Sequence, residues 1–421
     1  MVVAGAGRSR VVALGVASVL GLGGCGDRTV GGEGSTGEDT SAAGGSEQGE
    51  SEAGEAETAG EAETAGEAET AGETETAGET ETTGDPLDPC DPPVFADPEL
   101  EAKVRIYLSL ADDDPLDAEA LASLTHLSLF AESDEIEDLG GLECAVELDH
   151  LSLRNLGSVE LEPILGLTKL ERLWIVGSTI TALPPLASFP VLRELDVSDN
   201  PSLVDVSVLA DATSLERLDV SDTLVADLSA IAGSPSLEWL DAGRTPIADL
   251  EFAADLIALR GLAIDETGVT DLDPIAGLTQ LADLDVSHNP IDSIALLADF
   301  TSLTTLDMSS TGQADLSPLT GLPLRHLYAA DNGIVDVTAV VTFTPPDLEL
   351  GQLDLRDNQI VDLTPFMATA WHGVGCGGTE VMLAGTPVGL SPTLEQDYPY
   401  VCTLGAFVTW DLDSCGDPPC P

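Results

Sequence analysis

Basic residues are scarce in this chain. Its 421 residues include 14 Lys plus Arg against 76 Asp plus Glu, and the formal net charge at pH 7 is −62. Lysine occurs only as Lys103 and Lys169. Nucleic-acid binding depends on neutralising phosphates with a basic surface, and docking on anionic lipid depends on a basic patch. The composition therefore excludes nucleic acid as a partner and excludes a membrane contact made through basic side chains.

Aromatic residues and catalytic motifs are also few. Aromatic residues make up 4% of the chain and hydrophobic residues 43%, so any core is mainly aliphatic. The sequence contains no Gly-x-Ser-x-Gly, no His-Glu-x-x-His and no phosphate-binding Gly-rich loop. His126 and His150 precede leucines of neighbouring repeats near Arg172, and either they share a metal ion or they form a surface pair without a third ligand. We expect no enzyme, no cofactor and no metal site.

The first 25 residues have the pattern of an export signal. Arg8 and Arg10 precede an apolar run from Val11 to Leu22, which is too short to span a bilayer as a stable helix. The run ends in Leu-Gly-Gly-Cys, which is typical of a bacterial lipobox and predicts lipidation of Cys25. The alternative is an ordinary secretory signal with a chance cysteine. A lipid anchor implies an exported protein of the bacterial cell envelope, at the outer membrane or cell surface, tethered only by acyl chains.

Residues 26–89 are expected to form a disordered acidic stalk. From Asp27 to Pro89 there are 19 acidic residues and one basic residue, and residues 55–84 are five Glu/Thr-rich hexads such as EAETAG. The hexads have no aliphatic side chain larger than alanine, so ordering them would cost conformational entropy without burying apolar surface. The stalk is either a plain solvated spacer or a carrier of O-linked glycans on its threonines.

An internal repeat of 21 to 26 residues accounts for most of the remaining sequence. It has the leucine-rich pattern L-x-x-L-x-L-x-x-N, with at least eleven turns. Its strand leucines are Leu127, Leu151, Leu173, Leu195, Leu218, Leu240, Leu262, Leu284, Leu306, Leu327 and Leu353. One turn cannot bury its own leucines, whereas stacked turns share a continuous core. We therefore predict an α/β leucine-rich repeat solenoid, right-handed, with a parallel sheet on the concave face and short 3-10 or α segments on the convex face.

The residues of one turn indicate which side chains point into the core and which point outward. In one turn, Leu195 and Val197 point inward, Asp196 points outward, and the amide of Asn200 is expected to satisfy backbone groups of adjacent turns. Other turns keep this residue or replace it by threonine, as Asn289, Asn332, Asn358, Thr223, Thr245, Thr267 and Thr311. On the return path, Asp273-Pro274 and Ser317-Pro318 predict N-caps at Asp273 and Ser317, followed by proline at the first helical position.

Segments at both ends of the repeats resemble bacterial internalin-type leucine-rich repeat proteins. The resemblance rests on residues 95–129, on the turn LDVSHNPIDSIALLADFTSL at 284–303, and on VMLAGTPVG and LGAFVTWD near the end. It implies a helical N-terminal cap, a last turn and a closing strand. The predicted division is a signal peptide, stalk, N-terminal cap, repeats and final turn with C-terminal cap, at 1–25, 26–89, 90–126, 127–370 and 371–421. The stretched spacing at Pro345-Pro346 is either a binding insertion or a decayed repeat.

Cysteine usage fits export. Besides Cys25 there are six cysteines, all at the two ends of the repeats: Cys90, Cys144, Cys376, Cys402, Cys415 and Cys420. Six cysteines allow 15 pairings, and sequence alone does not choose among them. We expect disulfide-stapled caps, with Cys90 bonded to Cys144, and the pairs Cys376–Cys402 and Cys415–Cys420 as further candidates. The alternative, a metal site, lacks a Cys-x-x-Cys pair.

The outward residues of the strands supply the candidate ligand-binding surface. They are Trp174, Asp196, Asp219, Trp239, Asp241, Asp285, Asp307, Tyr328 and Asp354. The aspartates would form a column of like charges about 5 Å apart, which repel by up to about 1 kcal/mol per pair in water. A cationic partner or Ca²⁺ would relieve this repulsion, or the aspartates are scaffold residues of the repeat. Exposed aromatic side chains are frequent interface anchors, so Trp174, Trp239 and Tyr328 are either anchors or residues with a packing or edge role in the sheet.

The sequence favours a lipid-anchored extracytoplasmic binding protein. Its concave face would recognise a protein or a glycan in adhesion or protein–protein interaction. The alternative is a structural spacer or envelope component without a specific ligand.

Overall fold

A computed structural model describes residues 90, 92–130, 136–344, 351–362, 365, 380–383 and 385–386, and the backbone of 401–404 and 407–410. Two helices open the described chain, α1 (Pro98–Tyr107) and α2 (Ala118–Leu121). The carboxylate of Asp97 accepts the N–H groups of Glu99 and Leu100 at the start of α1, and Asp117 caps α2 through Ala120. The expected helical N-terminal cap is thus present.

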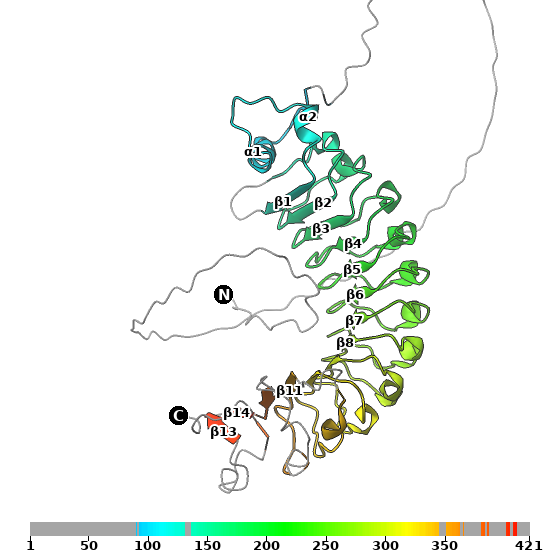
Figure 1. Cartoon of the computed structure of the whole chain (residues 1–421). Helices are drawn as coiled ribbons and strands as arrows, with labels where there is room; N and C mark the ends of the chain where they lie inside the picture. The colour runs from blue at the N-terminus through cyan, green and yellow to red at the C-terminus, as the bar shows by residue number, and fades with distance from the viewer. Residues whose placement is uncertain are drawn as a thin grey trace, which may run out of the picture. The chain divides into compact units, whose positions relative to one another are not determined.

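The repeats form one parallel sheet of twelve strands in sequence order. In the unit that carries them, the strands lie on the inner side of the arc and the 3-10 turns on the outer side (Figure 1). The strands are β1 (His126–Phe130), β2 (His150–Arg154), β3 (Arg172–Val176), β4 (Glu194–Asp196), β5 (Arg217–Asp219), β6 (Trp239–Asp241), β7 (Gly261–Ala263), β8 (Asp283–Asp285), β9 (Thr305–Asp307), β10 (His326–Tyr328), β11 (Gln352–Asp354) and β12 (Glu380–Met382). The predicted fold class is confirmed.

In the described residues, ten short 3-10 helices lie on the return path of successive turns. They are η1 (Leu142–Cys144), η2 (Glu162–Ile164), η3 (Leu186–Ser188), η4 (Ser207–Asp211), η5 (Ser229–Ile231), η6 (Glu251–Ala253), η7 (Asp273–Gly277), η8 (Ala295–Asp299), η9 (Ser317–Leu319) and η10 (Val340–Thr342). From β1 to β11, between 17 and 23 residues separate one strand end from the next strand, and the described part of each connection contains one 3-10 helix of three to five residues and no long α-helix.

The predicted N-caps at Asp273 and Ser317 are wrong by two residues. These residues are the first residues of η7 and η9, and no side chain hydrogen bond is made by the caps Leu272 and Leu316. The capping carboxylate comes earlier: Asp271 accepts the N–H of Asp273, and Asp315 that of Ser317, each at 2.8 Å. An aspartate reaches the amide two residues ahead in a tight Asx-type turn, which the short 3-10 segment requires.

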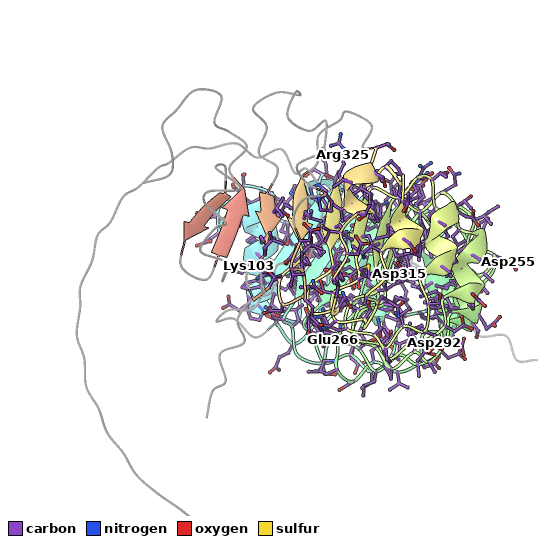
Figure 2. The ribbon with its side chains drawn as sticks, turned by 90° about the horizontal axis from the view of Figure 1, so that it is seen from below. Lys103, Asp255, Glu266, Asp292, Asp315 and Arg325 are labelled. Carbon is purple, nitrogen blue, oxygen red and sulfur yellow. A yellow bond between two sulfur atoms is a disulfide. The ribbon has the colours of Figure 1, made fainter. Side chains whose placement is uncertain are left out.

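The same outer capping occurs along the solenoid. Aspartates that accept the N–H two residues ahead are Asp205, Asp227, Asp249, Asp271, Asp315 and Asp336. We call them the outer aspartates. Charged side chains such as Asp255 and Asp292 project from the solenoid into solvent (Figure 2).

The core is a stack of aliphatic side chains, one set per turn. The strand leucines pair in register from Leu127 to Leu353, and the next strand contributes Val381. All of them are buried, together with the second inward residue of each strand, such as Val197 or Ile264. Burying a leucine or valine contributes about 1.5–3 kcal/mol, and each turn obtains this only when its neighbours cover it.

Buried asparagines link the turns as expected. Asn289 donates to the carbonyls of Ile264 and Val286, and its Oδ1 accepts the N–H groups of Thr267 and Gly268 on the preceding turn. We call the buried asparagines at this position of the repeat the ladder asparagines. The others donate to a carbonyl of the preceding turn in the same way: Asn200, Asn332 and Asn358. Where threonine replaces asparagine, its hydroxyl donates to the carbonyl three residues earlier, in Thr223, Thr245, Thr267 and Thr311.

A left-handed residue follows nearly every strand. Ten residues other than glycine have positive φ, and nine of these values, from Asn155 to Asp357, lie between 54° and 57°. Eight of the nine stand one position before the Asn or Thr at the ladder position of their turn, and Asn155 stands before Leu156. Left-handed backbone is costly for most residues and least so for Asn and Asp, which are common here. The chain therefore makes one fixed, identical bend per turn.

The N-terminal cap is closed by a disulfide between Cys90 and Cys144, the pairing expected from the sequence. At the other end, β13 (Val401–Leu404) and β14 (Phe407–Trp410) form an antiparallel pair. Cys402 lies in β13 without a described side chain, and Cys376, Cys415 and Cys420 lie outside the described residues, as do Cys25, the stalk and Pro345-Pro346.

Candidate binding surface on the concave face

The strand register places the predicted surface residues in two columns. Trp174, Asp196, Asp219, Asp241, Asp285, Asp307, Tyr328 and Asp354 occupy the middle outward position of successive strands. Trp239 lies in the preceding column, between Arg217 and Gly261 on its neighbouring strands. The register therefore brings all nine onto one sheet face.

The aspartates of the middle column bond to their own strand ends. The carboxylate of Asp219 accepts hydrogen bonds from the N–H of Ser221 at 2.9 Å and from the hydroxyl of Ser221 at 2.6 Å. Five others accept the same N–H two residues ahead, namely Asp196, Asp241, Asp285, Asp307 and Asp354. These hydrogen bonds favour the scaffold interpretation for the column, because each carboxylate holds the turn that follows its strand.

Burial and neighbouring carboxylates make several of these aspartates weak acids. Burial, followed by the charges of Asp241 and Asp196, raises the pKa of Asp219 to about 8. Burial and the charge of Asp307 raise the pKa of Asp285 to about 7, and burial raises the pKa of Asp307 as well. At neutral pH the column therefore carries fewer charges than its aspartates, which weakens the repulsion expected from the sequence.

Asp354 differs from the rest of the column. It is 3% exposed, and its carboxylate is bonded to the guanidinium of Arg356. Next to it, the hydroxyl of Tyr328 donates to Oε1 of Gln352. The C-terminal end of the concave face is thus occupied by internal bonds, although Tyr328 keeps part of its ring exposed.

An aromatic cluster lies at the N-terminal end, over β1 to β3. The ring of His150 is 4.6 Å from that of Trp174, edge to face, and the guanidinium of Arg154 lies 5.1 Å over the Trp174 ring. Tyr107, the last residue of α1, packs edge to face on His126 at 5.4 Å and donates to the carbonyl of Ser128. The cap helix thus extends the surface beyond the first strand.

The two histidines stand side by side in register, as predicted, but each pairs with an aromatic ring. Burial, followed by the positive charges of Arg172 and His126, lowers the pKa of His150. Throughout the ranges with described side chains, no three His, Cys, Asp or Glu side chains are placed to hold a metal ion. Sequence reasoning missed Tyr107 and Arg154, which the local patterns alone do not connect with Trp174.

Trp239 owes its position to a glycine. A Cβ on Gly261 would lie 2.1 Å from Cε3 of Trp239, so only glycine lets the indole lie across β7. The guanidinium of Arg217 lies 5.0 Å over the same ring. Trp174 and Trp239 are both half-buried, but Trp174 belongs to the aromatic cluster at the N-terminal end, so Trp174 is the better candidate for an anchor.

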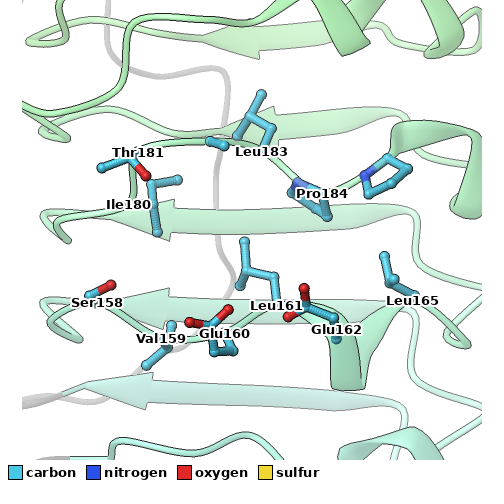
Figure 3. Close-up of a pocket in the computed structure, with 12 residues that line it drawn as sticks. Ser158, Val159, Glu160, Leu161, Glu162, Leu165, Ile180, Thr181, Leu183 and Pro184 are labelled. Carbon is cyan, nitrogen blue, oxygen red and sulfur yellow. The ribbon is translucent and has the colours of Figure 1, made fainter. Parts of the chain in front are cut away.

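A groove of about 230 Å³ lies away from the concave face, between the turns at 158–165 and 180–185. Figure 3 shows Leu161, Ile180 and Leu183 lining it, with Glu160 and Glu162 beside them. It occurs where Ala182 replaces an outer aspartate and where Pro184, two residues on, has no N–H to cap. Its lining offers no nucleophile with an oriented base, so it suggests no reaction.

Comparisons with solved structures agree with this architecture. An internalin (InlF) from Listeria monocytogenes matches with a TM-score of 0.61 and 27% identity, covering 69% of this chain and 83% of its own. A leucine-rich repeat protein of Leptospira interrogans matches with a TM-score of 0.53 and 19% identity, covering 63% and 74%. No family model and no curated protein matches the chain.

The fold and its parallel sheet define a leucine-rich repeat solenoid. The chain is an internalin-type leucine-rich repeat protein in its architecture, as its end segments indicated. This likeness favours protein–protein interaction or adhesion as the role of the fold. In the described part of the chain, no helix is both long and apolar enough to cross a bilayer.

Proposed function

We propose that this chain is a lipid-anchored extracytoplasmic binding protein. Its N-terminal signal ends in a lipobox cysteine, Cys25, and residues 26–89 form an acidic spacer before the folded repeats. The concave face recognises a protein or glycan partner at the bacterial cell surface. The domain limits of the sequence analysis are part of this proposal.

One observation carries the binding role, namely the aromatic cluster over β1 to β3. Trp174 and Tyr107 keep part of their rings in solvent on a face built of short, rigid strands. Large side chains fixed by their neighbours lose little entropy on binding, and such residues dominate interface energies. A spacer without a ligand has no use for this arrangement.

The binding role is tested by affinity capture with the full mature chain, made soluble by Cys25→Ser. Baits carrying Trp174→Ala are compared with the wild type and with Ile257→Ala, which removes a side chain that is 69% exposed next to η6. We expect a partner held by the wild type and the Ile257 variant and lost by the Trp174 variant. Equal capture by all three supports the alternative, a structural spacer.

The lipid anchor is tested separately. The wild type should incorporate a labelled fatty acid and partition into detergent, and Cys25→Ser should abolish both. Release of the unmodified wild type into the medium would instead identify an ordinary secretory signal.

A further inference from the structure

Two arginines of the concave face lack the ion pairs that other cations make. Within 4 Å of a carboxylate lie Arg105, Lys169, Arg172, Arg193, Arg244, Arg260 and Arg356. In the described portion of the chain, Arg154 and Arg217 have no such partner, although the protein has 76 acidic residues. Each is stacked on a tryptophan instead.

The surroundings of these two stacks differ in charge. Near Arg154 are the rings of His126 and His150 and the guanidinium of Arg172, which is 53% exposed and makes only a long 3.9 Å contact with Glu194. Arg217 has Glu194 beside it in register, and the carboxyl groups of Asp196, Asp219 and Asp241 follow in the next column. Glu194 also borders the N-terminal stack, because its carboxylate accepts the indole N–H of Trp174, and Asp196 is in register with Trp174. The N-terminal stack nevertheless has two guanidiniums, Arg154 and Arg172, whereas carboxyl groups outnumber the single guanidinium of Arg217 at the other stack.

The Arg154 guanidinium is held ready for a ligand. Its Nε donates to Oγ of Ser152 at 3.2 Å, and the Trp174 ring supports its face. Among the described residues no acceptor bonds to its two Nη groups, which can meet an outside acceptor. A planar guanidinium edge matches a carboxylate, which accepts two parallel hydrogen bonds. The neighbouring positive charges that lower the pKa of His150 also favour an anion at this position.

We infer that the Arg154–Trp174 stack, with Arg172, is an anchor for a carboxylate side chain of the partner, presented on an acidic polypeptide segment. This inference rests on the proposed binding role of the concave face and names the chemistry that meets its N-terminal end. The rest of the face is acidic, so the partner carries its acidic segment over β1 to β3 and not over β4 to β6. Charge thereby fixes the direction in which the partner lies.

A polypeptide carboxylate fits better than a cationic group or an apolar one. A cation would meet two guanidiniums, and an apolar group would leave the Nη donors desolvated without partners, which is costly. An exposed ion pair contributes little by itself, whereas a guanidinium already positioned by stacking loses less freedom on binding. At 0.15 M salt the screening length is about 8 Å, so the nearby charges outweigh the distant aspartates.

The test uses the full mature chain with ¹⁵N-labelled tryptophan and two synthetic peptides at 0.15 M salt. The acidic probe is acetyl-(Glu-Ala)₆-amide, and its neutral control is acetyl-(Gln-Ala)₆-amide. The indole N–H of Trp174 reports on the anchor because it is bonded to Glu194 at 3.1 Å beside it. The indole of Trp239, on the matched but acidic stack, is the internal control.

We expect the acidic peptide to shift the Trp174 resonance in a saturable way, and the neutral peptide not to. Arg154→Gln should weaken the apparent Kd about threefold to tenfold, since a charge-assisted contact is worth on the order of 1 kcal/mol at a part-exposed site. Arg217→Gln should leave it unchanged. Folding of both variants is checked by the unaltered positions of the remaining indole resonances.

Three results would overturn the inference. They are the absence of a Trp174 shift, an equal loss with Arg217→Gln, and saturable binding of oligogalacturonate with no binding of the acidic peptide, which would identify a glycan site. The proposed function is judged apart from these results. If the partner is captured equally by wild type and Arg154→Gln but lost by Trp174→Ala, the binding role stands and the carboxylate anchor fails.

Discussion

Aspartates on the concave face and the outer aspartates accept the same hydrogen bonds and yet differ in acidity. Asp219 and Asp227 both accept the N–H of a serine two residues ahead, at 2.9 and 2.8 Å. Burial and two neighbouring carboxylates raise the pKa of Asp219 to about 8. Hydrogen bonds to Ser229 lower the pKa of Asp227, which is fully exposed. For the pKa of these aspartates, the local turn is therefore less important than burial and the charges of neighbouring carboxylates.

The difference follows from how a solenoid stacks. Parallel strands are about 4.8 Å apart, so a carboxyl in one column meets its copy on the next strand with little water between. The outer aspartates occupy exposed loops, where water screens their copies. A repeat that places one acid inside the curve and one outside thus produces a weak acid and a strong acid from the same motif.

The largest expected effect comes from filling the gap in the concave column. Ala263, on β7, separates Asp241 from Asp285 and is 2% exposed. Ala263→Asp adds an unpaired carboxylate between two others, and we expect it to lower the free energy of unfolding by roughly 3 kcal/mol at pH 8. Urea denaturation measures this. Ala263→Asn controls for size, and Ala226→Asp, on an exposed loop, should change little; similar losses for both Asp variants would contradict the comparison.

The next effect concerns pH. Because the folded pKa of Asp219 lies above its ordinary value of 3.8, the folded state holds a proton that the unfolded state releases between pH 4 and 8. Folding stability from this group is therefore lost as pH rises through that window. Asp219→Asn should keep the bonds to Ser221 and raise the free energy of unfolding at pH 8.5 by about 2 kcal/mol. A pH series of thermal melts checks this, and an unchanged slope would refute it.

An outer aspartate should respond with the opposite sign. The folded pKa of Asp227 lies below 3.8, so its contribution is present above that pH and is lost as the pH falls through the folded pKa. Asp227→Ala should lower the melting temperature at pH 7, and this decrease should be smaller than the increase that Asp219→Asn gives at pH 8.5. The two chains should converge once the pH falls below the folded pKa of Asp227. Persistent destabilisation there would point to packing and not to the carboxylate.

The smallest effect is expected for Ala182→Asp, which should not raise the melting temperature. Ala182→Asp restores an outer aspartate to the turn beside the groove, but Pro184 has no N–H for it to accept. We expect no rise in melting temperature. Ser293→Asp is the matched case, because the N–H of Ala295 is available and is already bonded to the serine hydroxyl at 3.1 Å. It should give a small rise at neutral pH; a gain at Ala182 as large as this one would mean that capping is not the cause.

The sequence predicted the repeat, the inward leucines, the asparagine ladder and the Cys90–Cys144 pairing, because each depends on spacing along the chain. Two features depend on neighbours a whole turn away and were not predicted: the acidity of Asp219 and the glycine beside Trp239. The capping aspartates are local, two residues before the amide they accept, and were misplaced because Asp273 and Ser317 directly precede proline, a pattern typical of a helix N-cap. Gly261 is 22 residues after Trp239, which is one repeat, so this link could have been found by comparing outward positions of adjacent turns.

From β2 to β11, each described turn bends at a left-handed residue after its strand and returns to the same register, so the solenoid is built of equivalent repeats. Deletion of one repeat, as well as substitution of single residues, can therefore change the charge pattern of the concave face. Removing residues 262–283 joins two equivalent points of the repeat and sets Asp241 directly beside Asp285. The five aspartates from Asp196 to Asp307 would then form a continuous column on neighbouring strands. The loss of one repeat would thus change the charge pattern of the concave face without substituting any remaining residue.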